Sequence, residues 1–96
     1  MNGLSPTQEH FINRAIDNDE GVTNPSQKGC FIIMNNRATV NDGKPFPHFS
    51  LRELDWILQE GRGYVVNVGG VNMRLTKKAF QLVGRENEYE DPPVLG

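Results

Sequence analysis

The chain is short of cysteine and of long apolar runs. Of its 96 residues only Cys30 is a cysteine, so no disulfide can form within it, which fits a reducing compartment. The longest purely apolar run, Cys30 to Met34, falls far short of the ~20 residues that span a bilayer. Residues 1–7 hold no basic region followed by an apolar run. We therefore expect no signal peptide, no membrane association and a cytoplasmic location.

The chain also lacks the spacings that catalysis and metal binding need. One cysteine and two histidines, without Cys-x-x-Cys or His-x-x-x-His spacing, make no structural zinc set. The Gly61-Arg62-Gly63 and Gly69-Gly70 segments do not continue into a phosphate-binding loop. Cys30 lies in an apolar segment, where a thiol is usually inert, and its pairing with His48 is a minor alternative. We predict a non-catalytic protein without a cofactor or metal.

Charge is distributed unevenly along a chain whose net charge is only −2. Residues 37–85 carry eight cations against four carboxylates, whereas residues 86–96 carry four carboxylates and no cation. The cations of the middle segment are Arg37, Lys44, Arg52, Arg62, Arg74, Lys77, Lys78 and Arg85. A basic middle segment suits an anionic partner, and ordinary scatter of surface charge is the alternative.

The first helix has a clear start signal. Ser5 is placed as N-cap, Pro6 as first helical residue and Gln8 as the partner in a capping box. The apolar stripe that follows consists of Phe11, Ile12, Ala15 and Ile16. We expect the helix to end near Asn18 and residues 19–29 to form a loop.

Two short strands and an extended segment are expected next. The apolar run Cys30–Met34 has the length of a buried strand. Residues 37–40 can pair back on it across Asn35-Asn36, because asparagine tolerates positive φ. The two prolines of residues 44–49 require an extended backbone there.

The second helix is predicted over residues 50–60, with Gly61 as its C-terminal cap. Ser50 to Glu53 make a second capping box, and Phe49 with Leu54 makes a hydrophobic staple. Trp56 lies off the centre of the apolar stripe, so we expect it to be partly buried.

A hairpin with a Gly69-Gly70 turn is predicted for residues 64–75. That turn pairs Val68 with Val71, Val66 with Met73 and Tyr64 with Leu75, all on one face of the ribbon. The pairs Asn67 with Asn72 and Val65 with Arg74 fall on the other face.

Thr76 caps a short third helix, Lys77 to Val83, which Gly84 ends. We expect residues 86–96 to form a disordered acidic tail, which leaves one domain over residues 1–85. The predicted fold class is α+β, in the order helix, strand, helix, β-hairpin and helix, with a small antiparallel sheet against the helices.

Two groups of polar residues are candidates for binding. Lys77 and Lys78 lie in the first turn of the third helix, where a phosphate would offset their repulsion by the helix dipole. Arg62, Asn67, Asn72 and Arg74 lie on or beside the hairpin and are residue types that contact phosphates and base edges. The alternative in both cases is a simple solvated surface.

The pattern Leu51-x-x-Leu54-x-x-Ile57-Leu58-x-x-Gly61, then the hairpin and residues 74–80, resembles the second half of a winged-helix domain. The opening residues 4–8 also resemble the first helix of that family. The resemblance implies a recognition helix that approaches a DNA groove through Arg52 and a wing that offers Arg62 and Arg74. The sequence departs from the family at residues 35–49, where Asn, Gly and Pro exclude the helix that precedes the recognition helix.

The sequence therefore predicts a small DNA-binding regulatory protein of winged-helix-like form, with duplex DNA as partner. The alternative is a protein-interaction or inhibitory module, such as a mobile-element or phage protein that blocks a host partner. Its contacts would come from Phe46, His48 and Trp56, together with the acidic tail.

Overall fold

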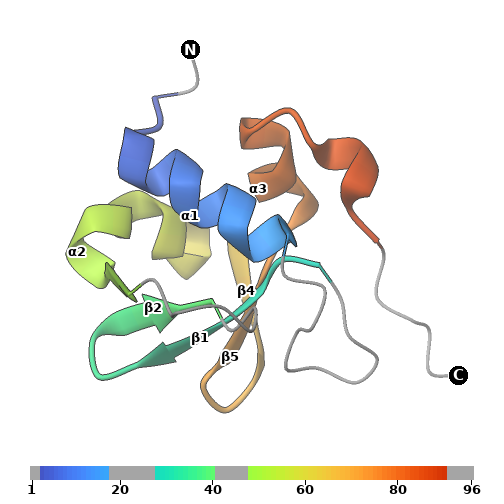
Figure 1. The fold of residues 1–96 in the computed structure, drawn as a ribbon. Helices are drawn as coiled ribbons and strands as arrows, with labels where there is room; N and C mark the ends of the chain where they lie inside the picture. Colours follow the sequence, from blue (N-terminus) through green and yellow to red (C-terminus); the bar gives the residue numbers. More distant parts are fainter. Residues whose placement is uncertain (1–2, 18–27, 41–47, 91–96) are drawn as a thin grey trace, which may run out of the picture.

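A computed structural model describes residues 3–17, 28–40 and 48–90 of the chain (Figure 1). These residues form an α+β domain with three α-helices and a five-stranded antiparallel sheet. The elements are α1 (Pro6–Asp17), β1 (Cys30–Met34), β2 (Arg37–Thr39), β3 (His48–Ser50), α2 (Leu51–Leu54), β4 (Val65–Gly69), β5 (Asn72–Leu75) and α3 (Lys77–Leu82). Three 3₁₀ turns complete the order: η1 (Asp55–Leu58), η2 (Glu60–Arg62) and η3 (Glu86–Glu88). The predicted fold class is confirmed.

The sheet has the strand order β3-β2-β1-β5-β4, so β4 is an edge strand. Figure 1 shows the helices gathered on one side of the sheet, with the tips of the two hairpins projecting away from them. The face toward the helices is apolar, because alternate strand residues share a face. Pairs such as Phe31 with Met73 and Ala38 with Phe49 lie on it, and all four residues are buried.

Phe11 of α1 connects this face to the helical layer. Its ring centroid lies 4.9 Å from that of Phe31 and 5.1 Å from that of Phe49, both in edge-to-face geometry. The whole predicted stripe of α1 is inaccessible to solvent, as expected for a helix packed on a sheet.

The predicted capping box of α1 is confirmed. The Gln8 N–H donates to Ser5 Oγ at 3.1 Å, and the Ser5 N–H donates to Gln8 Oε1 at 2.9 Å. Gln8 is nearly buried, and its Nε2 also donates to the carbonyls of Leu54 at 3.2 Å and Glu53 at 3.4 Å. One side chain therefore starts α1 and holds the end of α2.

The prediction of one helix over residues 50–60 is wrong. Ser50 does cap α2, since its Oγ accepts from the Arg52 N–H at 3.1 Å, but α2 ends at Leu54. Asp55 follows with φ of 49°, and the chain continues as η1 and η2. The carbonyls of Glu53 and Leu54, which would accept α-helical bonds from Ile57 and Leu58, accept from Gln8 instead. A tertiary contact has replaced the helical continuation.

The hairpin across Asn35-Asn36 is confirmed. Both asparagines have positive φ, 52° and 60°, and Met34 pairs with Arg37 across the turn. The predicted extended backbone before residue 50 is seen at residues 48–50, where β3 pairs with β2. The rest of that segment, with Lys44 and Phe46, lies outside the described residues.

The predicted register of the second hairpin is wrong by one residue. Val66 lies opposite Arg74 rather than Met73, and Val68 is the extra residue of a bulge between Asn67 and Gly69. Asn67 shapes this bulge, since its Oδ1 accepts from the Gly69 N–H and its Nδ2 donates to the Gly70 carbonyl, both at 3.0 Å. Because a one-residue shift exchanges the two faces of a strand, Val66 points away from the core and is 46% exposed.

Residues 86–90 are not the disordered start of a tail. Residues 86–88 form η3, and the Tyr89 ring packs edge-to-face on Phe80 at 5.3 Å. Glu88 accepts from Arg85 at 2.5 Å and from Lys28 at 3.1 Å, and Arg85 also pairs with Asp17 at 2.6 Å. The pKa of Glu88 is lowered from 4.5 to about 2 by its hydrogen bonds to Arg85 and Lys28. Residues 91–96 lie outside the described residues.

We expect the contribution of Glu88 to stability to be lost in acid. A carboxylate whose pKa is lower in the folded than in the unfolded chain stabilises the fold above the unfolded pKa, and this contribution disappears as pH falls. Glu88→Gln should therefore be less stable than the unchanged protein at pH 7, and the difference should shrink from pH 5 toward pH 2. Urea unfolding of both proteins across this range measures it, and a difference independent of pH would contradict the assignment.

Candidate functional site

The described cations divide between the two ends of the sheet. Arg37 pairs with Met34 and with Ser50, whose hydroxyl caps the helix that carries Arg52, so both arginines lie beside the β1–β2 turn. The strand β5 runs antiparallel to β1, away from that end, and leads directly into Lys77 and Lys78. The described cations of residues 37–85 therefore do not form one surface, and a smaller group must be sought.

That smaller group forms where β5 enters α3. Lys78 Nζ donates to the Arg62 carbonyl at 2.8 Å and lies 4.6 Å above the centre of the Tyr64 ring. The Tyr64 ring meets Trp56 edge-to-face at 5.1 Å. We call Trp56, Arg62, Tyr64, Lys77 and Lys78 the aromatic–cation cluster.

Local backbone structure explains how these residues meet. The η2 turn ends at Gly63, whose φ of 80° redirects the chain into β4. Thr76, between β5 and α3, donates its hydroxyl to the Gly63 carbonyl at 2.5 Å and its N–H to the Tyr64 carbonyl at 2.9 Å. These two bonds fix the start of α3, and with it Lys78, against the end of η2.

The cations of the cluster lie at the surface, where the Arg62 Nε also donates to Gln59 Oε1 at 3.0 Å. Arg62, Lys77 and Lys78 are exposed, and none has a carboxylate partner within salt-bridge distance among the described residues. Asp55, which directly precedes Trp56, and Glu60, in the same turn as Arg62, are the carboxylates closest in sequence to the cluster. Three cations against these two carboxylates leave a small positive local charge beside two half-buried rings.

Arg74, predicted to contact nucleic acid, lies inside the molecule with 1% of its surface exposed. Its guanidinium donates to the carbonyls of Lys28 at 3.1 Å and Glu90 at 2.5 Å and to the Tyr89 hydroxyl at 3.4 Å. It also stacks over the Tyr89 ring at 4.6 Å. The structure gives Arg74 a structural role and removes it from the candidate surface.

The other predicted contacts are scattered. The amide of Asn67 is used within the hairpin turn, and Asn72 is half-buried in β5 opposite Ile32. Arg52 lies in α2, four residues before Trp56, and no printed contact joins its side chain to the cluster. Of the predicted protein contacts, Phe46 lies outside the described residues, His48 is placed only as a backbone position in β3, and Trp56 joins the cluster.

An apolar surface is the feature that the sequence prediction missed. Among the described residues the exposed large apolar side chains are Met34, Val66, Val68 and Val71, and we call them the apolar tip. Val71 lies beside the end of β1, because the Ile33 N–H donates to its carbonyl at 3.0 Å, and Val66 and Val68 lie on β4 of the same hairpin. The sequence register had put the three valines on one face of the ribbon with Met73 and Leu75, and the bulge at Val68 shifts that register.

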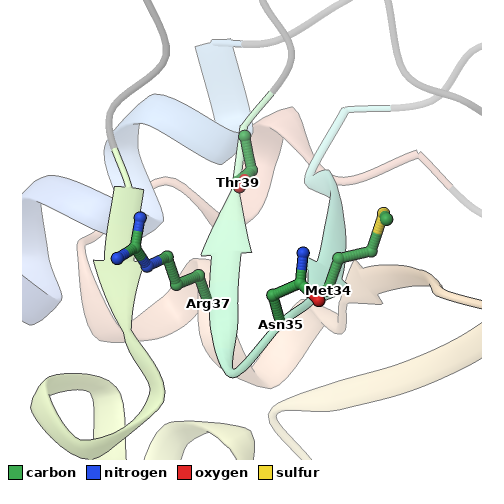
Figure 2. A pocket seen from close by; sticks show the side chains of 4 residues that line it. All are labelled: Met34, Asn35, Arg37 and Thr39. Carbon is green, nitrogen blue, oxygen red and sulfur yellow. The ribbon is translucent and has the colours of Figure 1, made fainter.

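Two hollows mark the described surface. The first, of about 410 Å³, lies over the β1–β2 hairpin and is lined by Met34, Asn35, Arg37 and Thr39 (Figure 2). The second, of about 350 Å³, lies along the outer side of α1. Neither lining includes a serine or a cysteine, and no group of three metal-ligating side chains occurs among the described residues.

None of the helices among the described residues has the length and apolar character needed to cross a bilayer.

Comparison with known proteins adds no relative. No family model matches the chain, and neither a curated protein nor a solved structure matches it significantly. Function must therefore be argued from the residues themselves.

Replacement of Arg74 should cost stability. Arg74→Met keeps an unbranched side chain but removes all three hydrogen bonds, so we expect the free energy of unfolding to fall by about 1.5–3 kcal/mol. The exposed Arg52 provides the matched control, since Arg52→Met should change it by no more than about 0.5 kcal/mol. Urea unfolding followed by circular dichroism compares the two, and equal small effects would show that the buried guanidinium is dispensable.

Proposed function

We propose that this protein binds nucleic acid without catalysing a reaction, and that the aromatic–cation cluster is its contact surface. One observation carries the proposal: the exposed Lys78 ammonium lies over the Tyr64 ring, which meets Trp56, and the exposed Arg62 and Lys77 lie close to these residues in the chain. A transcription-regulatory role in a reducing cytoplasm extends the same proposal.

The chemistry of the cluster suits the two parts of a nucleotide. Arginine and lysine side chains contact phosphate oxygens, and release of condensed counterions makes such contacts favourable at low salt. Aromatic rings offer π-faces to bases of any sequence. A simple anion would use the cations and leave the rings without a role, so the combination favours nucleic acid.

Loss of the two lysines should weaken binding and its salt dependence together. Each phosphate contact adds about 0.7 to the salt slope on a single strand and about 0.9 on a duplex, so Lys77→Gln with Lys78→Gln should lower the slope by about 1.4 to 1.8. Fluorescence anisotropy of labelled single-stranded and duplex DNA at 50 to 200 mM salt measures both quantities.

The matched control for this pair is Arg37→Gln with Arg52→Gln. It removes the same charge from residues beside the β1–β2 turn, away from the start of α3, and should leave most of the affinity intact. Equal losses in the two double variants, or binding that does not respond to salt, would contradict a contact surface at the cluster.

A second candidate function is binding of a protein partner through the apolar tip. The exposure of its four side chains, from 39% to 55%, favours this, because adjoining exposed apolar residues mark interaction surfaces. An inhibitory module of this kind would act by covering a partner's surface.

Charges at the apolar tip should abolish such binding. In a pull-down from a lysate of the source cell, Val68→Lys with Val71→Lys should lose a protein that the unchanged chain retains in stoichiometric amount. The double variant Lys77→Gln with Lys78→Gln should keep it. If both variants recover the same proteins as the unchanged chain, the apolar tip has no such role.

A further inference from the structure

The segment expected to read a duplex groove does not form a recognition helix. A major groove accepts a continuous helix that presents several side chains to the base edges. Here α2 has four residues, and Asp55 then turns the chain away with positive φ. The longer helix α1 buries its apolar stripe and presents Glu9 and Asp17, which phosphates would repel.

The hairpin is equally unsuited to a DNA groove. Residues 64–73 carry no charge, and the ribbon's cation, Arg74, is buried beneath Tyr89. The Asn67 amide is occupied by Gly69 and Gly70. What the ribbon exposes is valine, which neither neutralises a phosphate nor bonds to a base edge.

The aromatic–cation cluster has the composition of a single-strand platform. Proteins that hold single strands combine cations along the backbone with rings on which unpaired bases stack, and no helix need enter a groove. In a duplex the bases are already stacked on one another, so the rings would add little to binding. The cluster therefore favours single strands, because its rings can stack on unpaired bases but not on bases inside a duplex.

We propose that the ligand of the aromatic–cation cluster is single-stranded nucleic acid, with an unpaired base stacked on Trp56 and flanking phosphates held by Arg62, Lys77 and Lys78. The inference rests on the nucleic-acid function proposed above. Lys78 occupies one face of Tyr64, and Trp56, although packed against the core, keeps part of its surface exposed. The edge-to-face contact with Tyr64 holds the indole while part of it stays exposed. Stacking tolerates every base, so the preference is for strandedness rather than sequence.

Trp56 itself provides the test, because it is the chain's only tryptophan. The unchanged protein is titrated with a twelve-nucleotide oligothymidylate, with an abasic strand of the same length and with a twelve-base-pair duplex, at one low salt concentration. The abasic strand keeps the phosphates and removes the bases. We expect oligothymidylate to quench Trp56 emission and to bind at least about tenfold more tightly than the abasic strand. We expect the duplex to bind no more tightly than the abasic strand.

A variant separates stacking from charge. Trp56→Leu, followed with end-labelled strands by anisotropy, should reduce oligothymidylate affinity to the abasic level and leave abasic affinity unchanged. Its fold is checked by circular dichroism, and if it fails to fold, the three-ligand comparison on the unchanged protein decides alone. Equal affinity for oligothymidylate and the abasic strand, or tightest binding to the duplex, would overturn the single-strand inference and leave nucleic-acid binding standing. Absence of binding to all three strands would overturn both.

Discussion

A buried guanidinium holds the parts of this fold together. Met73 and Leu75 turn toward the helices, so Arg74 between them starts on the opposite side of β5. There its guanidinium donates to the carbonyl of Lys28, which precedes β1. It also donates to the Tyr89 hydroxyl and the Glu90 carbonyl, which follow η3. A buried cation is costly unless its donors are satisfied, so these partners are required rather than incidental. The segment after α3 is structured because it completes this site.

The pairing of Arg74 also determines what the surface can do. Had the guanidinium been exposed, the hairpin would have been a basic ribbon and a plausible wing. With its charge buried, the ribbon is neutral and its valines face solvent. Positive charge then concentrates at the other end of β5, around Arg62, Lys77 and Lys78. The same Arg74 hydrogen bonds therefore order the C-terminal segment and leave the hairpin surface without a cation.

Local signals in the sequence predicted the parts of the fold that depend on neighbouring residues. The Ser5–Gln8 capping box and the Asn35-Asn36 turn form as expected, since each needs only a few consecutive residues. The helix over residues 50–60 failed because Gln8, some 45 residues earlier, takes its carbonyls. The hairpin register failed because Asn67 bonds within the turn and inserts Val68 as a bulge. Residue propensities and hydrophobic patterns do not predict contacts between distant residues or hydrogen bonds made by a particular side chain.

The candidate site was predictable only in part. Lys77 and Lys78 could be placed at the start of α3 from Thr76 and the apolar pattern. Their contact with Arg62 and Tyr64 could not, because it depends on how η2 meets α3 across Gly63 and Thr76. The burial of Arg74 has no local signal, since its acceptors are backbone carbonyls and a tyrosine hydroxyl far along the chain.

The bulge in β4 limits how copies of this chain can associate. An edge strand rich in valine invites another strand to extend the sheet, and repeated addition of that kind produces fibres. The displaced Val68 and the twist it imposes interrupt the straight row of backbone donors and acceptors that such growth requires. The exposed valines thus lie on an edge strand whose backbone ladder the bulge interrupts.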